Sequence, residues 1–246
     1  MGWFVSEGFT TGSCGGKIQI PGRGYQVGIS QNPGKKADRI AWVLEQMGYP
    51  FHFYGQRNFI ISNKQLWERL KPLGNSYSKY IPRDVLNLDS DCLKSLWGSL
   101  VDGDGWRRPS DGKRNEREVY ATVSERLASD VQELLLKLGY SSSVSRRIVS
   151  PCRLHDKSYN SVPQFYVYKN TGKWGVLRDS SGETKISSEH YEGMVYCATV
   201  PSHTLVVRRN KKPVLTGNCV RYLCMSNPIF DQLLMNVNDY ELQEAA

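Results

Sequence analysis

The sequence of 246 residues has few of the features that mark zinc-binding, secreted or membrane-spanning proteins. No two of its six cysteines form a Cys-x-x-Cys pair, and the four histidines lack metal-ligand spacing, so the common zinc patterns are missing. No segment resembles a signal peptide, and no apolar run reaches the length of a membrane span. We therefore expect no membrane partner and mostly free thiols in a reducing cytoplasm, that of a prokaryotic or phage-infected cell.

Acidic side chains are also in short supply. The chain has 24 Asp and Glu against 32 Lys and Arg, which gives a net charge of +8. Such an excess favours an anionic partner, usually nucleic acid, although a merely basic protein has the same balance. Residues 219–246 depart from it, with one basic and four acidic side chains. We interpret this last segment as a different piece of protein.

Apolar residues recur at helical spacing just before an Asp-Gly-Asp-Gly sequence. Spacing of i, i+3, i+4, i+7 and i+8 predicts one buried helix face, made by Leu93, Leu96, Trp97, Leu100 and Val101. Asp89 or Ser90 can cap the start of this helix, and glycines can end it. Asp104 then lies at the helix C-terminus, where the macrodipole disfavours a carboxylate by about 0.3–1 kcal/mol. A carboxylate in this place needs a compensating cation.

A second copy of this pattern opens the chain. Met1–Phe9 (MGWFVSEGF) aligns Glu7 with Asp104, and Val5 stands where the second copy has Asp102. Strand-like residues, an amphipathic helix ending in Gly-Tyr and more strand-like residues follow each acid. In the first copy we expect strands at 17–20 and 25–30, a helix at 37–49 and strand-like residues at 50–62. In the second copy we expect a strand at 119–123, a helix at 128–140 and strand-like residues at 141–150. The sequence therefore predicts a duplicated α+β unit of about a hundred residues.

The two repeated helices carry small residues that permit close packing. These residues are Gly2 and Ser6 in the first copy and Gly98, Ser99 and Gly103 in the second. Side-by-side helices would bring Glu7 and Asp104 together at two negative helix ends, where a divalent cation relieves the repulsion. Carboxylates with the backbone oxygens of Gly8 and Gly105 favour Mg²⁺ or a similar ion. Such a site suits metal-dependent phosphodiester hydrolysis.

Basic, polar and aromatic side chains follow each acid and could form a DNA-binding surface. In the first copy the candidates are Lys17, Gln19, Arg23, Tyr25 and Gln26. In the second copy they are Arg107, Arg108, Lys113, Arg114 and Arg117. Strands can enter the major groove, where Arg, Lys and Gln read base edges. A solvated sheet face explains any one of these residues better than DNA binding does. The whole set, taken with the charge balance, favours DNA.

The paired motifs, MGWFVSEG and WGSLVDGDG, resemble those of the LAGLIDADG homing endonucleases of the monomeric, two-motif kind. The segment KYIPRDVLNLDSDCLKSLWGSLVDGDG also matches the lead into the second motif in intein-borne members. This resemblance covers roughly residues 1–190. It implies an α+β fold with pseudo-twofold symmetry, in which two αββαββα-like halves form a DNA saddle with their sheets. The motif helices lie at its centre.

The resemblance also assigns roles. Glu7 and Asp104 take the metal-binding acid positions, and Mg²⁺ or another divalent cation is the implied cofactor. Members often have a basic or polar residue near the metals, for which Lys169 and Lys17 are the candidates. The implied partner is a double-stranded DNA target, and the implied state is a monomer. Because Met1 falls inside the first motif, we expect that helix to lack its usual N-terminal turns.

The C-terminal part carries a different chemistry. The segment VYCATVPSHTLVVRRN followed by PVLTGNC resembles the C-terminal splicing blocks of inteins, which belong to a HINT-type β fold. Asn218 would attack its own carbonyl and cut the chain, and Cys219 would be a downstream nucleophile. Cys197 stands where many inteins carry an acid, and His203 lies in a block that often supplies a catalytic histidine. Gly217 replaces the usual histidine.

These observations divide the chain into four parts. Residues 1–94 and 95–190 are the two endonuclease halves, 191–218 the splicing segment and 219–246 a host-protein remnant. The N-terminal splicing blocks are missing, so splicing would need a separate N-terminal intein segment and the host protein as partners. Two alternatives stay open: a catalytically inactive DNA-binding intein relic, and an autoprocessing fragment that cleaves only after Asn218.

Overall fold

The computed structural model describes residues 1–11, 24–110, 112, 116–148, 152–154, 157–159, 162–170, 190, 192–194, 200, 204–209 and 211–217. The chain divides into two compact units, Met1–Gly175 and Val176–Ala246. None of the helices in the described ranges has the length and apolar character that crossing a bilayer requires.

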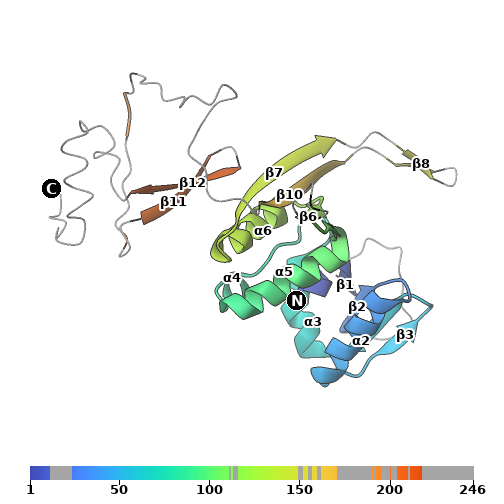
Figure 1. Cartoon of the computed structure of the whole chain (residues 1–246). Coiled ribbons are helices and arrows are strands. Elements are labelled where there is room, and N and C mark those ends of the chain that lie inside the picture. The colour runs from blue at the N-terminus through green and yellow to red at the C-terminus, as the bar shows by residue number, and fades with distance from the viewer. Residues whose placement is uncertain are drawn as a thin grey trace. The chain divides into compact units, whose positions relative to one another are not determined.

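The first half of the larger unit is a four-stranded antiparallel sheet with a motif helix and a covering helix (Figure 1). Its elements are α1 (Gly2–Glu7), β1 (Gly8–Thr10), β2 (Gln26–Ser30), α2 (Lys35–Gln46), β3 (His52–Tyr54) and β4 (Asn58–Ser62). The strand order is β1-β2-β4-β3. In the described range β2 pairs with β4 on one side and with β1, which directly follows Glu7, on the other. The strand expected at 17–20 lies outside the described residues.

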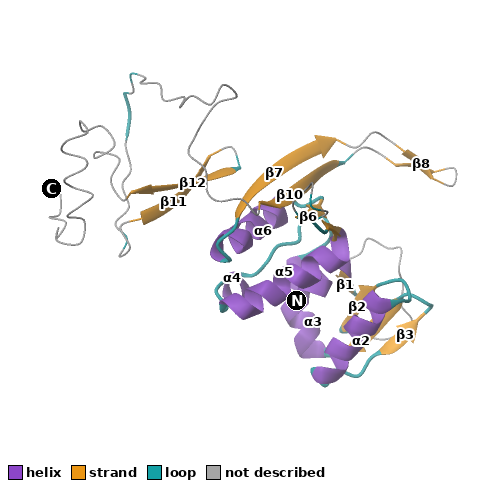
Figure 2. Cartoon of the chain, viewed as in Figure 1, coloured by secondary structure: helices purple, strands orange, loops and turns teal. Residues whose placement is uncertain are grey.

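The second half repeats this plan in the same element order. It contains α5 (Ser90–Asp104), β5 (Gly105–Arg108), β6 (Arg117–Thr122), α6 (Glu125–Lys137), β7 (Ser141–Ile148) and β10 (Pro163–Asn170). Its sheet has the order β5-β6-β10-β7, so each strand takes the position of its counterpart in the first sheet. A short pair, β8 (Cys152–Leu154) and β9 (Lys157–Tyr159), lies between β7 and β10 in the sequence. The predicted duplication is confirmed at the level of topology (Figure 2).

Local sequence explains where the helices begin and end. The Asp89 carboxylate accepts hydrogen bonds from the backbone N–H groups of Asp91 and Cys92 and starts α5 as expected. The Ser124 hydroxyl accepts from the N–H of Leu127 and starts α6. Gly48 and Gly139 follow α2 and α6 with φ of 69° and 82°, a backbone conformation that favours glycine. The repeated Gly-Tyr signal therefore marks two equivalent helix ends.

A connecting segment between the halves packs on the second covering helix. It contains α3 (Lys64–Leu70), a 3₁₀ turn η1 (Lys71–Leu73) and α4 (Arg83–Leu86). The N–H of Ile81 donates to Asp130 of α6 at 2.9 Å, and Arg83 pairs with Glu133 at 2.6 Å. Because α5 begins at Ser90, the second half opens a few residues before the expected boundary at 94/95.

In the smaller unit, the described residues form one antiparallel hairpin of β11 (Thr204–Arg209) and β12 (Lys212–Gly217). Lys211 occupies the turn with φ of 62°. The alternating apolar and polar residues of this segment therefore form two paired strands. Two strands alone do not define a HINT-type fold.

Candidate functional site

The two motif helices pack against each other without large side chains between them. A Cβ atom added to Gly103 would lie 2.5 Å from Cβ of Ser6, and one added to Gly2 would collide with the Ser99 hydroxyl. The expected close packing is therefore confirmed at these positions. Gly98 is different, because a Cβ there would meet no atom within 4 Å. Its small size is not required by the helix contact.

This packing brings Glu7 and Asp104 into one partly buried site at the ends of α1 and α5. The side chain of Glu7 passes Gly103, since a Cβ on that glycine would lie 3.7 Å from Cγ of Glu7. Burial and the charge of Glu7 together raise the pKa of Asp104 to about 6. Burial likewise raises the pKa of Glu7. Burial and mutual repulsion disfavour the ionised forms of both carboxyl groups. A cation bound between them would stabilise those ionised forms.

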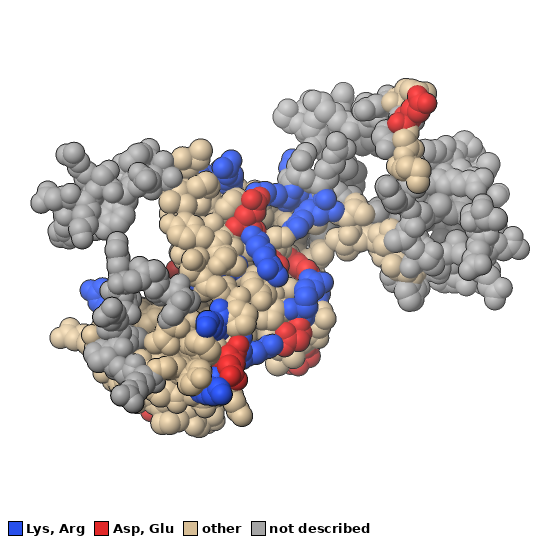
Figure 3. All heavy atoms as spheres, turned by 180° about the vertical axis from the view of Figure 1, so that it is seen from behind, with Lys and Arg blue, Asp and Glu red and all other residues tan. Residues whose placement is uncertain are grey.

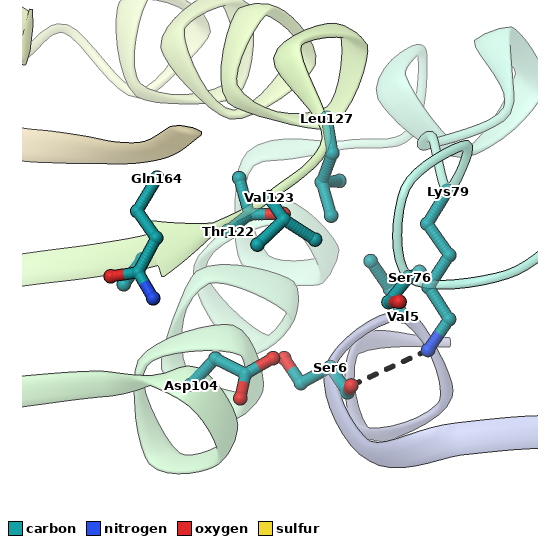
Figure 4. A pocket seen from close by; sticks show the side chains of 10 residues that line it. Val5, Ser6, Ser76, Lys79, Asp104, Thr122, Val123, Leu127 and Gln164 are labelled. Carbon is teal, nitrogen blue, oxygen red and sulfur yellow. Dashed lines mark hydrogen bonds between the residues drawn. The ribbon is translucent and has the colours of Figure 1, made fainter. Parts of the chain in front are cut away.

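Lys79 supplies one such cation, and sequence reasoning missed it. Its ammonium group donates to the carbonyls of Phe4 at 2.9 Å, Ser6 at 3.3 Å and Gly8 at 2.8 Å. Figure 4 shows the bond to Ser6. The side chain is buried and therefore caps the C-terminal end of α1. It lowers the pKa of both acids, against the effect of burial. In the sequence, the feature that could have pointed to Lys79 is its place as the first residue of the segment KYIPRDVLNLDSDCLKSLWGSLVDGDG, which leads into the second motif.

A cavity of about 300 Å³ opens beside this site. Its lining includes Val5, Ser6, Ser76, Lys79, Asp104, Ala121, Thr122, Val123, Leu127 and Gln164. The Gln164 amide oxygen also accepts a hydrogen bond of 2.6 Å from the Tyr166 hydroxyl, which fixes its direction. The cavity therefore presents a carboxylate and a side-chain amide from the second half and an ammonium group from the connecting segment.

The donor set fits a hard divalent cation. Mg²⁺ is commonly held by one or two carboxylates, with waters and phosphate oxygens completing its shell. Glu7 and Asp104 provide two such ligands, and no group of three or more His, Cys, Asp or Glu gathers elsewhere in the described ranges. Burial and the charges of Asp104 and Glu7 raise the pKa of the buried Tyr120 hydroxyl, and a hydrogen bond with Ser6 opposes them. The backbone oxygen of Gly8, expected as a metal ligand, instead accepts from Lys79.

Two residues expected at the metal or the DNA lie on the helix side of the second sheet. Lys169 donates to Glu118 at 2.8 Å, and Arg107 donates to Glu118 at 2.7 Å and to Asp102. The register pairs Arg107, Glu118 and Lys169 across β5, β6 and β10, so all three share one face. Glu118 also accepts from Trp97 of α5, which identifies that face. Lys169 does not line the cavity, and the metal or DNA roles expected of Lys169 and Arg107 stay predictions.

Strand alternation puts a different set on the open face of this sheet. Arg117 lies over the ring of Tyr168 at 4.7 Å, and Arg147 lies over Tyr166 at 5.0 Å. Arg147 also donates to the Tyr168 hydroxyl at 3.1 Å. Arg108 pairs with Arg117 in the register and therefore shares this face. We call Arg108, Arg117, Arg147, Tyr166 and Tyr168 the arginine–tyrosine face. Arg147, Tyr166 and Tyr168 were not singled out from the sequence.

The described open face of the first sheet is less charged. The Ser30 hydroxyl donates to Asn58 at 2.6 Å, and Gln26 is buried with its amide oxygen unbonded. Tyr25 packs edge-on against Trp67 at 5.1 Å, just outside β2. Elsewhere, Lys and Arg lie beside Asp and Glu over the surface seen in Figure 3. Net charge alone therefore does not locate the DNA surface.

Several predicted residues lie outside the described residues. They are Lys17, Gln19, Arg23, Lys113 and Arg114 of the DNA set, and Cys197, His203, Asn218 and Cys219 of the splicing set. Their roles stay predictions.

Comparisons with known proteins bear on this arrangement. The chain is 29% identical over 209 residues to an ATP-dependent Clp protease proteolytic subunit of Chlamydomonas moewusii, covering 80% of this chain and 20% of that protein. It is 27% identical over 250 positions to the C-terminal section of a DNA-directed RNA polymerase subunit beta of Stigeoclonium helveticum (88% and 23%). It is 28% identical over 164 residues to a ribonucleoside-diphosphate reductase subunit beta of Aquifex aeolicus (59% and 21%). The chain thus spans about a fifth of the length of these curated relatives.

Among solved structures, the chain is similar to a variant of the homing endonuclease I-DmoI in complex with its target DNA and magnesium. The identity is 12% and the TM-score 0.41, with 69% of this chain and 85% of that chain covered. A family match covers part of the second half. Residues 91–174, which run from α5 past the end of β10, match the model of a LAGLIDADG-like domain.

Proposed function

We propose that the chain is a site-specific endonuclease that hydrolyses phosphodiester bonds of double-stranded DNA with a divalent cation. The observation that carries the proposal is the meeting of Glu7 and Asp104 at the ends of two symmetry-related helices, beside a cavity that also contains Lys79. The LAGLIDADG-like match of residues 91–174 supports it.

Each residue of the site has a distinct part in this proposal. Glu7 and Asp104 hold the cation, which polarises the phosphate and stabilises developing charge on oxygen when bound. Lys79 fixes the end of α1 through three carbonyls, and so holds Glu7 in position. Gln164 extends toward the cavity from the DNA-facing side of β10, where it can position a phosphate or a water.

The arginine–tyrosine face supports DNA as the partner. A guanidinium group stacked on a tyrosine ring loses little freedom when it binds, and Arg reads guanine O6 and N7 with two hydrogen bonds. Arg108 and Arg117 also add positive charge next to the phosphate backbone.

The test incubates the full chain with Mg²⁺ and linear duplex DNA carrying the uninterrupted host gene, in which the Cys219 codon follows directly on upstream host sequence. We expect two fragments, and no cleavage in EDTA or of unrelated DNA. Replacing Arg117 and Arg147 by Ala should weaken DNA binding. The slope of the logarithm of the binding constant against the logarithm of the salt concentration should become smaller by about one for each replaced Arg that binds a phosphate. Arg83→Ala with Lys94→Ala, both exposed and away from this face, is the matched control. Equal loss in the control would contradict the proposed surface.

We further propose that this endonuclease is carried by an intein. The relatives have unrelated names, a protease subunit, a polymerase subunit and a reductase subunit, and the chain spans only about a fifth of each. A shared segment in otherwise unrelated proteins supports an inserted element. The sequence blocks at 195–219 support a splicing role for the same element.

In that role the side-chain amide nitrogen of Asn218 attacks its own backbone carbonyl carbon. The new C–N bond closes a succinimide, and the peptide bond to Cys219 breaks and releases the Cys219 amino group. Mass spectrometry of the purified chain should reveal a released fragment of residues 219–246 that Asn218→Ala abolishes. An intact wild-type chain after prolonged incubation would contradict this second proposal and leave the endonuclease proposal unaffected.

A further inference from the structure

Trp106 of β5 lies on the open face of the second sheet. Its neighbour Arg107 points toward α5, where it donates to the Gly98 carbonyl, so alternation sends the Trp106 side chain to the opposite face. The register places Trp106 opposite Val119 of β6, whose partner on the other side is Tyr168 of β10. Val119 is fully buried although it lies on this open face, which fits its position between two aromatic residues. Trp106 itself is 44% exposed, so the row ends in a large apolar surface that the described chain leaves uncovered.

Phe9 of β1 occupies the equivalent position in the first sheet. It follows Glu7 by two residues, as Trp106 follows Asp104. The register places Phe9 opposite Gly28 of β2, and a Cβ atom added to this glycine would overlap the phenyl ring. The two neighbours of Gly28 in the strand belong to the core, so Gly28 and Phe9 lie on the open face. Each motif acid is therefore followed by one aromatic side chain on the open face of its own sheet.

These two aromatic side chains lie next to the proposed metal site and on the surface that would meet the DNA. Two residues of a strand span roughly 7 Å, which equals two base-pair steps of roughly 3.4 Å. Each ring would therefore lie within a few base pairs of the phosphate that the preceding acid brings to the cation. On the second sheet, Arg108 and Arg117 share the face of Trp106 and would attract the DNA backbone to it.

The chemistry of the two rings limits what they recognise on DNA. A phenyl ring has no hydrogen-bond donor or acceptor, so it gains nothing from a phosphate group or a polar base edge. Stacking on a base would first require that the base step be unstacked, which costs free energy. The major groove, which admits strands, presents one apolar group, the C5-methyl group of thymine, and apolar side chains contact it there. A thymine methyl group is therefore the partner that fits both rings without distortion of the duplex.

We propose that Trp106 and Phe9 are specificity-determining residues that contact the C5-methyl groups of thymines beside the cleaved phosphodiester bonds. The inference rests on the proposed function, because it assumes that the open faces of the two sheets bind the DNA target. The two residues belong to different halves of the larger unit, so each reads its own side of the target. The target then has at least one thymine within about three base pairs of the cut on each side.

The test first maps the cuts that the wild-type full chain makes in the host-gene duplex with Mg²⁺. Synthetic duplexes of this site then carry deoxyuridine in place of the thymines within about three base pairs of the cut on one side, which removes only methyl groups. Fluorescence anisotropy in EDTA gives the affinity for the thymine duplex divided by that for the uracil duplex. For wild type we expect a ratio of about four for each contacted methyl group. The ratio should fall to about one on one side in Trp106→Ala and on the other side in Phe9→Ala.

Two further variants separate methyl recognition from general damage to the fold. Trp42→Ala removes an exposed tryptophan of α2 and should keep the wild-type ratios on both sides. Trp106→Leu keeps an apolar side chain at the same place and should keep a ratio above one. Because each ratio compares two duplexes on the same protein, a uniform loss of affinity does not change it.

Each outcome has a separate meaning. A wild-type ratio of one on both sides, or a target without thymine in these base pairs, overturns the inference, while cleavage by the same chain keeps the endonuclease proposal standing. Wild-type ratios in Trp106→Ala and Phe9→Ala overturn it as well, because other residues would then read the methyl groups. A chain that neither binds nor cuts any duplex of the host gene overturns the proposed function and this inference with it.

Discussion

Arg39 of α2 donates a hydrogen bond of 2.6 Å to the Asp102 carboxylate of α5, and so joins the first half of the unit to the second motif helix. Asp102 also pairs with Arg107 of β5. The first copy has Val5 at the position of Asp102, so this link exists on one side of the pseudo-twofold axis only.

We expect Asp102→Asn to lower the free energy of unfolding by about 1–3 kcal/mol, because the largely buried negative charge is lost and one of the two oxygens that accept from Arg39 and Arg107 becomes an NH2 donor. Arg39→Ala should cost less, about 0–1 kcal/mol, since its side chain is 57% exposed. Urea unfolding of both variants and the double variant measures the coupling. Additive effects would show that the Arg39 link carries no energy.

The shifted pKa of Asp104 predicts a gain of stability on removing its charge. A carboxyl group whose pKa rises from 3.8 to about 6 on folding destabilises the folded state when ionised at pH 7.5, and this cost disappears as the pH falls toward 4. Asp104→Asn should therefore raise the melting temperature in EDTA by about 2–8 °C at pH 7.5.

The gain from Asp104→Asn should shrink at pH 4, where the wild-type carboxyl group is protonated. Asp91→Asn, on the exposed first turn of the same helix, is the control and should give no gain. A lower melting temperature for Asp104→Asn at pH 7.5 would contradict the assigned environment of Asp104.

Glu118 predicts the opposite pH dependence. Burial opposes ionisation, but hydrogen bonds from Lys169, Trp97 and Arg107 outweigh it and lower the pKa of Glu118 from 4.5 to about 2. The resulting stability, up to about 3 kcal/mol, is present above pH 4.5 and is lost as the pH falls toward 2. Glu118→Gln should destabilise the chain at pH 7, and the difference from wild type should narrow as the pH approaches 2. A constant difference across this range would contradict the network.

Two glycines of α5 offer a matched pair for the helix contact. Gly103→Ala would bring a Cβ to within 2.5 Å of Ser6 and should destabilise the chain by about 1–3 kcal/mol. Gly98→Ala meets open space and should stabilise α5 by about 0.5–1 kcal/mol. Thermal unfolding compares the two, and equal effects would argue against close packing at Gly103.

Local patterns predicted much of this fold. Patterns of a few residues encode the apolar face of α5, its cap at Asp89 and the two Gly-Tyr helix ends. Because the same pattern occurs in both halves, each half supported the elements predicted for the other. The meeting of Glu7 and Asp104 followed from small residues at Gly2 and Gly103.

The parts that failed depend on strand register and long-range contacts. Lys79 reaches the end of α1 from 71 to 75 positions away in the chain, and no local pattern encodes that contact. Arg107 and Arg108 are adjacent, yet alternation sends one toward α5 and the other to the open face. A register error of one residue would exchange the positions of those two side chains, so the sequence alone does not decide which of them faces α5.

The central claim is that Glu7 and Asp104 act together at one metal-dependent site. Its most direct test is the Mg²⁺-dependent cleavage rate, at saturating enzyme, of wild type, Glu7→Gln, Asp104→Asn and the double variant, with Asp91→Asn as control. We expect each single variant to lose at least about 100-fold, the double variant to lose little more than either, and the control to cleave like wild type. Single variants that cleave at the wild-type rate would contradict the claim.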